Sequence, residues 1–483
     1  MGNELRKLQP QALWSYFDAL CAVPRPSKME DKAVAFVRDF AITQGLDYTV
    51  DSVGNVIIRK PASPGMEKRT GVILQAHLDM VPQKNNDIQH DFEKDPINAF
   101  VDGDWVRAKG TTLGADNGIG VAAMLAVLES KDIAHGPLEA LFTVDEETGG
   151  TGAIALQAGL LKGSVLINLD TEEEGVLYIG CAGGIFATTS FPYVAEPSEK
   201  DSIGFKINLT GLKGGHSGLD INLGRGNANK LLNRFLWTAA RDYGVRVSSV
   251  EGGDMSSAIP REASAIVAVP ASKVDDWKKT VVDFQTTISL ELNGVESDIS
   301  FTAGQVERPV TVMSRQSQDN ILNAIYAVPN GVYRMIAEFP EVVETSTNLG
   351  IVKSDNQQVE IICLLLSSTA SVKEDLTNAI VATCKLAGAT TILDGSFPEW
   401  EPNLHSGILK TMKDVYQNLY GSPATVQVIH GGLECAIFKG SYPDIDSISF
   451  GPTIESPHSP EERVNIPSVA RFWDYLIETL KNV

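Results

Sequence analysis

The sequence has few cysteines, no long apolar run and fewer basic than acidic residues. Its five cysteines are scattered along 483 residues without paired spacing, which argues against a disulfide framework and against a cysteine-based zinc site. No stretch approaches the roughly 18 apolar residues of a membrane span, so we expect no membrane partner. Lys and Arg number 40 against 61 Asp and Glu, and the net charge of -21 disfavours a nucleic-acid partner, because phosphate recognition needs clustered cations.

The opening segment also lacks the layout of a secretory signal. In "MGNELRKLQPQALW" no charged region is followed by an apolar one, so we expect a cytoplasmic protein. Apolar residues make up 43% of the chain, as in ordinary globular proteins. A length of 483 residues predicts two or three domains at roughly 150 residues each.

Strand and helix patterns alternate in the first and last parts of the chain. Apolar runs at 72–74, 138–144 and 165–169 predict strands, with amphipathic helices between them. This alternation is typical of an α/β domain whose mostly parallel central sheet is covered by helices. The middle of the chain mixes period-two and helical segments, which predicts an α+β domain. We therefore predict a catalytic domain made of residues 1–186 and 400–483, interrupted by an inserted α+β lid domain at 187–399.

Histidines and carboxylates stand where the predicted strands stop. They are His77, Asp79, Asp116, Glu146, Glu147, Asp170 and, in a late proline-rich loop, His458. The carboxyl ends of parallel strands meet at one edge of a sheet, where ligands usually bind. So many like charges can share a site only if cations neutralise them. Imidazole and carboxylate ligands suit zinc, manganese or cobalt, and two such ions can share one carboxylate.

Each of these features also has a plain structural explanation. His77 and Asp79 would form a hydrogen-bonded turn, Asp116 would lie in a turn or cap a helix, and Glu146 and Glu147 would lie in a solvated loop or helix start. Asp170 would belong to an acidic surface loop, and His458 would be held exposed between prolines. Their order along successive strand ends favours one shared metal site over several unrelated loops.

Longer motifs around these residues resemble those of the aminoacylase/carboxypeptidase-like family of co-catalytic zinc peptidases. The similar segments are "AHLDMVPQK", "GTTLGADNGIG", "DEETGGTGA", "LINLDTEEEG", "GPTIESPHSPEERV", "LKGGHSG", "AIPREA" and "GLEC". Together they spread over essentially the whole chain. Within the family the chain resembles the bacterial dipeptidases that act on Xaa-His peptides, so the resemblance implies metal-dependent hydrolysis of dipeptides and short unblocked peptides.

The resemblance implies a role for each residue of the site. The metal ligands would be His77 and Asp170 for one divalent ion, Glu147 and His458 for a second, and Asp116 as the bridge. Zinc is the expected metal, with manganese and cobalt as alternatives. Glu146 would be the general base that takes a proton from the attacking water. Asp79 would orient the His77 ring. In this family the peptide bond after the bridging aspartate is often cis, and here that bond would be Asp116–Asn117.

The resemblance assigns the substrate side to the inserted domain. It makes His216 a donor to the oxygen of the scissile carbonyl, although alone it would be an ordinary loop histidine. In relatives with a smaller insert this histidine comes from a partner subunit. Because the insert is longer here, we hypothesise that a duplicated lid supplies His216 within the same chain, with a homodimer left open.

Two positions depart from the family pattern. Relatives have an arginine where Leu366 stands and an asparagine where Ser257 stands. Arg261 is then a candidate partner of the substrate carboxylate, with a surface ion pair as the alternative. Glu434 is a candidate partner of the substrate amino group, with helix capping as the alternative.

Three functions therefore stay open. The first is a metallo-dipeptidase that takes a small peptide as substrate. The second is an amidohydrolase or deacylase acting on N-acylated amino acids or other small amides, which the missing arginine favours. The third is a catalytically silent peptide- or metal-binding relative, and Glu146 speaks against it because metal binding does not require that residue.

Overall fold

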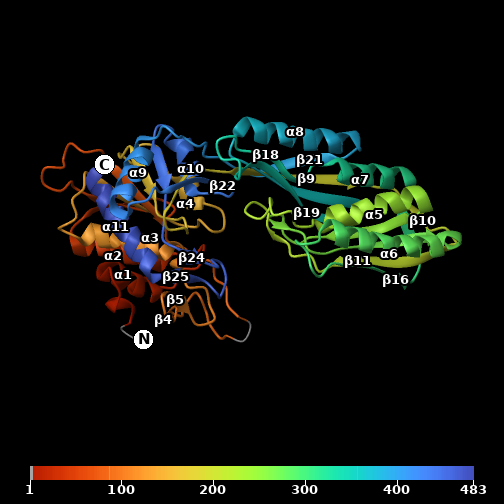
Figure 1. The fold of residues 1–483 in the computed structure, drawn as a ribbon, viewed down its shortest axis with the longest axis horizontal. Helices are drawn as coiled ribbons and strands as arrows, with labels where there is room; N and C mark the ends of the chain where they lie inside the picture. The colour runs from red at the N-terminus through yellow and green to blue at the C-terminus, as the bar shows by residue number, and fades with distance from the viewer. Residues whose placement is uncertain (1–3, 86–87, 356) are drawn as a thin grey trace. The chain divides into compact units, whose positions relative to one another are not determined.

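The computed structural model describes residues 4–85, 88–355 and 357–483. These residues divide into two compact units (Figure 1). The first unit consists of Met1–Gly180, Pro402–Val428 and Leu433–Val483, and the second of Cys181–Glu401 and Ile429–Gly432. The second unit contains the predicted insert, begins and ends slightly outside it, and takes in a short segment from the C-terminal part of the chain.

The first unit is built on an eight-stranded sheet with the order β1-β2-β6-β3-β7-β23-β8-β22. Its strands are β1 (Asp47–Val50), β2 (Val56–Lys60), β3 (Val72–His77), β6 (Leu138–Thr143), β7 (Val165–Asn168), β8 (Val176–Cys181), β22 (Thr425–Ile429) and β23 (Asp446–Ser449). The central strands β6, β3, β7 and β23 are parallel, whereas β2 and β8 flank them in antiparallel pairing. Every residue of β3 and β6 is buried, as expected for a sheet covered on both faces. The predicted α/β fold with a mostly parallel central sheet is confirmed.

Helices of the first unit pack against this sheet or against one another. They are the short η1 (Leu5–Lys7), α1 (Gln11–Cys21), α2 (Asp31–Gln44), α3 (Ala115–Glu129), α4 (Thr151–Ala155), α9 (Gly407–Tyr420), α10 (Glu434–Ser441) and α11 (Ile466–Asn482). Helix α3 contacts β3 and α1, and it is apolar and buried almost all round because it lies between them. Helices α9 and α10 contact β23. Among the residues described, no helix combines the length and apolarity needed to cross a membrane.

A second, small sheet in the first unit has the order β24-β25-β5-β4. Its strands are β4 (Ala99–Asp102), β5 (Trp105–Ala108), β24 (Ile454–Glu455) and β25 (Arg463–Asn465). The loop between β24 and β25 contains the predicted ligand His458. The small sheet therefore fixes both ends of that loop.

The second unit is built on a nine-stranded antiparallel sheet with the order β16-β11-β15-β13-β19-β20-β9-β21, in which β18 also pairs with β19. Its strands are β9 (Gly183–Pro192), β11 (Ser202–Thr210), β13 (Arg246–Gly252), β15 (Ala263–Pro270), β16 (Ser300–Val306), β18 (Gly331–Met335), β19 (Val343–Asp355), β20 (Gln358–Ser367) and β21 (Thr390–Phe397). Two short pairs accompany it, β10 (Ala195–Pro197) with β17 (Thr311–Met313), and β12 (Gly215–His216) with β14 (Ala258–Ile259).

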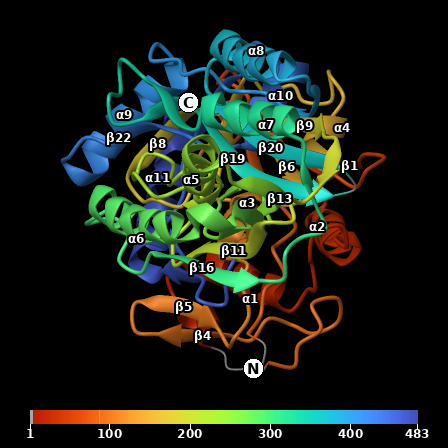
Figure 2. The same cartoon turned by 90° about the vertical axis from the view of Figure 1, so that its right-hand side faces the viewer.

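Four long helices of the second unit share one core with this sheet. They are α5 (Ala228–Tyr243), α6 (Val274–Glu291), which follows the short η2 (Ala271–Lys273), α7 (Arg315–Ala327) and α8 (Ala370–Leu386). They contact one another in the order α6-α5-α7-α8 and form a single row (Figure 2). The core is centred on Trp277, whose ring packs against Phe205 and Phe235.

The second unit contains the same succession of elements twice. The first set is β11-α5-β13-β15-α6-β16, and the second is β9-α7-β19-β20-α8-β21. Within the sheet the two sets have mirrored strand orders, so that β13 and β19 meet at the centre and β16 and β21 form the edges. The topology is that of a duplicated strand-helix-strand-strand-helix-strand unit, with the first copy inserted after the first strand of the second.

Candidate metal centre

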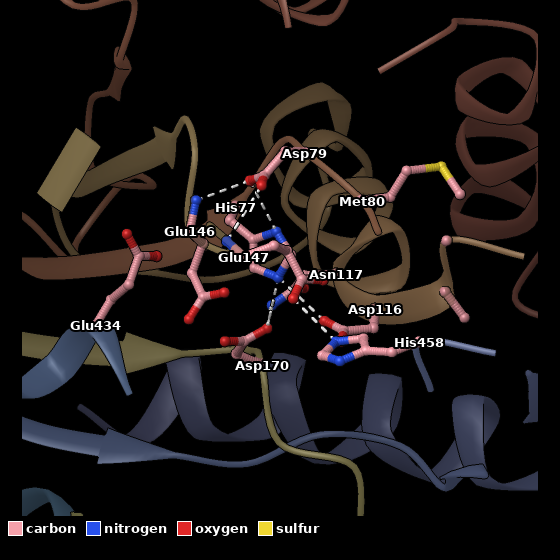
Figure 3. A network of polar contacts seen from close by, with 12 residues as sticks. His77, Asp79, Met80, Asp116, Asn117, Glu146, Glu147, Asp170, Glu434 and His458 are labelled. Atoms are coloured by element: carbon pink, nitrogen blue, oxygen red, sulfur yellow. Dashed lines mark hydrogen bonds and ion pairs between the residues drawn. The ribbon is translucent and has the colours of Figure 1, made fainter. Parts of the chain in front are cut away.

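The carboxyl edge of the parallel strands gathers the residues singled out in the sequence (Figure 3). Strand β3 ends at His77, and the loops after β6 and β7 carry Glu147 and Asp170. Asp116 lies at the start of α3 in a non-helical conformation, and the Asp116–Asn117 peptide bond is cis. Four separate segments of the first unit thus bring their polar side chains together with His458.

Two histidine–carboxylate triads share Asp116. In the first triad, Nε2 of His77 lies 3.0 Å from Oδ1 of Asp116 and 3.2 Å from Oδ1 of Asp170. In the second, Nε2 of His458 lies 3.1 Å from Oδ2 of Asp116 and 2.9 Å from Oε2 of Glu147. Asp116 therefore presents one carboxylate oxygen to each triad, as a residue that bridges two cations would.

The charges of the two triads fit divalent cations. Burial opposes protonation of the His77 ring, but the carboxylates around it, Asp170 first, raise its pKa well above the ordinary value. Hydrogen bonds to Asp116 and Glu147 raise the pKa of His458 to about 11. Oε1 of Glu147 is buried and has no hydrogen-bond partner among the residues described. Cations in the two triads would replace the ring protons and give this oxygen a partner.

Asp79 connects the His77 ring to the loop that follows β6. Its Oδ1 lies 3.3 Å from Nδ1 of His77, the ring nitrogen that faces away from the first triad. The backbone N–H groups of Glu146 and Glu147 and the hydroxyl of Ser27 donate to the Asp79 carboxylate. Burial by itself raises the pKa of Asp79. The His77 ring and these donors outweigh burial and lower the pKa to about 2. Asp79 is thus an ionised residue that lies beside the outer nitrogen of the ring.

Glu146 lies between the triads and a further buried carboxylate. Burial raises the pKa of Glu146 well above the ordinary value, and the charges of Asp170, Glu434 and Glu147 add to this effect against the opposing charge of His77. Ligand atoms of Glu146, Glu147 and His77 also lie within 4.8 Å of one another. A buried carboxyl group whose pKa is raised beside such a centre is suited to proton transfer.

Glu434 is the first residue of α10 and is buried. Its Oε2 accepts hydrogen bonds from Nε2 of Gln75 (2.6 Å) and from the hydroxyl of Thr143 (2.8 Å). Its Oε1 has no partner among the residues described, and burial raises its pKa to about 8. The sheet side chains therefore hold one oxygen and leave the other available.

His216 is an exposed residue in the loop that contains β12 of the second unit. Its Nδ1 accepts hydrogen bonds from the backbone N–H groups of Gly218 and Leu219, both at 3.0 Å. In the neutral ring the proton must then be on Nε2, so this nitrogen is a donor. The loop packs closely, since a Cβ atom on Gly218 would lie 2.1 Å from the carbonyl oxygen of His430 and 2.9 Å from Cδ1 of Leu366.

The other residues predicted for the substrate side also lie in the second unit. Leu366 is buried in a small apolar cluster with Ala182, Leu364, Phe186 and Phe397. The carbonyl of Ser257 accepts a hydrogen bond from the N–H of Ser217, so Ser257 lies beside the His216 loop. Arg261 is exposed, and its Nε donates to the carbonyl of Leu212.

Sequence reasoning missed several polar residues around these groups. They are Arg25, Glu172 and Glu462 in the first unit and His430 in the second. Burial and the charges of Asp116 and Asp170 raise the pKa of Glu172 to about 9. Nε2 of His430 lies 2.7 Å from the hydroxyl of Ser346, and burial lowers the pKa of His430 to about 4. The only signal was position: Glu172 and Glu462 follow proposed ligands by two and four residues.

A parallel sheet with paired histidine–carboxylate triads at its carboxyl edge defines a hydrolase of the α/β metallopeptidase class. The chain belongs to peptidase family M20/M25/M40, whose match spans residues 73–482. It is 46% identical over 481 residues to a cytosol non-specific dipeptidase of Escherichia coli (strain K12), covering 100% of this chain and 99% of that protein.

Solved structures show the same fold. The crystal structure of an aminoacylhistidine dipeptidase from Vibrio alginolyticus matches with a TM-score of 0.90 and 45% identity, covering 99% of this chain and 98% of the other. The aminopeptidase PepT from Bacillus cereus matches with a TM-score of 0.58 at 14% identity, over 98% of this chain and 99% of the other, and so shares the fold alone.

Proposed function

We propose that the chain is a metal-dependent dipeptidase of the cytosol that hydrolyses dipeptides and short unblocked peptides, Xaa-His dipeptides among them. The observation that carries this proposal is the sharing of Asp116 by two triads beside the buried carboxyl group of Glu146. The names of the relatives from Escherichia coli and Vibrio alginolyticus support the substrate class, and the first also supports the location.

We assign the two triads to two divalent ions, with zinc favoured and manganese and cobalt as alternatives. The ligands would be His77 and Asp170 for the first ion, Glu147 and His458 for the second, and Asp116 for both. When bound, two such ions activate a water molecule and polarise the carbonyl group of the substrate. The mixed imidazole and carboxylate donors and the partnerless Oε1 of Glu147 fit this assignment.

The side chains of the first unit would then divide the proton chemistry between them. Glu146 accepts a proton on its carboxylate from the attacking water and later delivers it to the leaving nitrogen. Asp79 keeps Nδ1 of His77 engaged, so that Nε2 faces Asp116 and Asp170. Oε1 of Glu434 is the proposed acceptor for the amino group of the substrate.

The second unit would contribute the remaining polar contacts to the substrate. His216 donates from Nε2 to the oxygen of the scissile carbonyl, a role that fits its fixed tautomer. Arg261 is the proposed partner of the substrate carboxylate, and Ser257 lies beside the same loop. We propose that the duplicated second unit supplies His216 within one chain, so that catalysis does not depend on a homodimer.

A mixture of two inactive variants tests this last point. Glu146→Gln and His216→Ala chains, combined before assay, are expected to stay inactive because each functional site needs both residues from the same chain. Recovered activity in the mixture would mean that His216 acts on a partner subunit.

The second candidate function is an amidohydrolase or deacylase, favoured by one observation. Leu366 lies in an apolar cluster and offers no charge to a substrate carboxylate. A substrate panel with added Zn²⁺ or Mn²⁺ separates the two functions, with Xaa-His and carnosine-like dipeptides against N-acetyl amino acids. Cleavage of the dipeptides supports the first proposal, and cleavage of the acylated compounds alone would replace it with the second.

A further inference from the structure

The segment 113–116, which presents the shared Asp116, is held by the buried carboxylate of Glu462. Oε2 of Glu462 accepts hydrogen bonds from the N–H groups of Leu113 (2.7 Å) and Gly114 (2.9 Å), and Oε1 accepts from those of Ala115 (2.7 Å) and Asp116 (3.3 Å). Glu462 is 2% exposed. A single carboxylate thus satisfies four successive backbone donors that would otherwise be buried without partners.

The same segment is held from the other side by Arg25, which is 3% exposed. Its Nη1 donates to the carbonyl groups of Leu78 (2.9 Å) and Asp79 (2.8 Å), directly after β3, and its Nη2 donates to the carbonyl of Gly114 (2.5 Å). Gly114 has a positive φ of 69°, and a Cβ atom there would lie 2.5 Å from Nη2. Glycine therefore allows the guanidinium group to reach the segment.

Each of these side chains connects the segment that carries Asp116 to the segment that carries the histidine of one triad. Glu462 lies four residues after His458, so its hydrogen bonds connect the His458 loop to the segment 113–116. Arg25 connects the end of β3, which carries His77, to the same segment. Neither side chain is a member of either triad.

We propose that Glu462 and Arg25 are positioning residues, each of which secures one of the two metal triads. Glu462 sets the position of Asp116 relative to His458, and Arg25 sets it relative to His77. This proposal rests on the proposed function, because it needs the triads to bind ions. It predicts a selective effect: loss of one positioning residue weakens the binding of one ion and leaves the binding of the other unchanged.

The variants Glu462→Gln and Arg25→Lys test this selectivity in the full-length chain. The amide keeps the shape of Glu462 but turns an NH₂ group toward N–H donors, and lysine cannot reach three carbonyl groups in a fixed fork. The matched controls are Glu461→Gln, whose parent side chain is 70% exposed and pairs with Arg107, and Arg38→Lys, a surface residue beside Asp39. Metal-free protein is dialysed against Co²⁺, bound ions are counted, and circular dichroism and the melting temperature check folding.

Unsubstituted protein and both controls are expected to bind two Co²⁺ ions. Glu462→Gln should lower the affinity for one ion by about 10–100-fold, and Arg25→Lys should lower the affinity for the other ion by a similar factor. The sites are assigned by combination with ligand variants. In a chain that already carries His458→Ala, Glu462→Gln should cause no further loss of ion binding, because the ion of that triad is already lost. In a chain that carries His77→Ala, Glu462→Gln should lower the affinity for the ion that remains.

Two results would overturn the inference. One is unchanged binding of both ions in Glu462→Gln and Arg25→Lys, and the other is an equal loss of both ions, which would indicate a general structural role. If Glu462→Gln does not fold, Glu462→Asp takes its place, with the same selective loss expected. Failure of the unsubstituted chain to bind Co²⁺ would contradict the proposed function itself and is distinguished by that measurement.

Discussion

The two units bury their polar side chains in opposite ways. At the sheet edge of the first unit, carboxylates face one another and raise the pKa values of the two histidine rings among them. In the second unit, two buried neutral side chains of β19 pair with other neutral groups: the hydroxyl of Thr345 lies 2.8 Å from that of Ser367, and the hydroxyl of Ser346 lies 2.7 Å from Nε2 of His430. The charge of the first arrangement must be balanced by protons or by metal ions, whereas the neutral pairs of the second unit need neither.

The sheet edge of the first unit is thus a centre whose charge balance depends on bound ions. The buried pairs of the second unit are already complete in the folded protein. Charged groups that repel one another in a low-dielectric interior persist only where a ligand or a function requires them. Hydrogen-bonded pairs of neutral groups instead make a sheet rigid. We therefore expect substitutions in the first unit to alter ion binding and chemistry, and substitutions in the second unit to alter substrate contacts alone.

The largest effect is expected for Glu146→Gln. The amide keeps the size of the side chain but cannot accept and return a proton, so kcat should fall by about 10²–10⁴-fold. Glu146 is not a member of the two triads that share Asp116, so the variant should still bind two ions. Turnover of a dipeptide and the metal content are measured on the same sample, and near-normal turnover would remove Glu146 from the mechanism.

The corresponding change in the second unit is His216→Ala. Loss of the Nε2 donor should lower kcat by about 10²–10³-fold, because the charge that develops on the carbonyl oxygen loses one hydrogen bond. Metal content and melting temperature should match those of the unsubstituted chain, since His216 belongs to the second unit. A loss of bound metal would contradict the assignment of ion binding to residues of the first unit.

A smaller effect is expected for Asp79→Ala. The variant should retain both ions but lose activity by about 10–100-fold, because the His77 ring is no longer held through Nδ1. Ser27→Ala is the matched control, since it removes only one donor to the same carboxylate. His77→Ala should instead lose metal, and a fully active Asp79→Ala would show that the ring needs no such support.

The clustering of the proposed ligands could be predicted from the sequence, because each of them ends or follows a strand or begins a helix. The end of a parallel strand is a local feature, and its register places His77, Glu147 and Asp170 on one edge whatever else the chain does. Glu462 and Arg25 could not be predicted, because their partners are backbone groups of residues 113–116 and 78–79. Nothing in the sequence distinguishes the buried Glu462 from the exposed Glu461 beside it.

The substrate side was harder to predict for a related reason. Contacts in the antiparallel sheet of the second unit join residues far apart in the chain, such as Ser346 with His430. The period-two pattern predicts strands but not their order in the sheet. For this reason Leu366 could be singled out in the sequence, whereas the apolar cluster around it could not.

The smallest effect concerns the stability of the metal-free protein, and it tests the two units against each other most directly. Burial raises the pKa of Glu434 to about 8 and that of Glu172 to about 9, and neighbouring carboxylates raise that of His458 to about 11. The folded first unit therefore binds more protons than the unfolded chain from about pH 4.5 upward, and its free energy of unfolding must fall as the pH rises through these values. The lowered pKa of Asp79 acts only below about pH 4. The lowered pKa values of His90, His135 and His430 oppose the trend only below about pH 6.5, and that of Lys230 opposes it only above about pH 8.

The melting temperature of the metal-free chain should therefore decrease between pH 5 and pH 9, by about 2–4 °C for each kcal/mol lost. Glu434→Gln should weaken the decrease, because the amide keeps an oxygen for Gln75 and Thr143 without a titrating proton. Saturating Zn²⁺ should weaken it further by replacing the protons on His77 and His458. Differential scanning calorimetry at several pH values measures this, and a melting transition that is equally pH-dependent with and without Zn²⁺ would mean that the acidic edge of the first unit does not depend on cations.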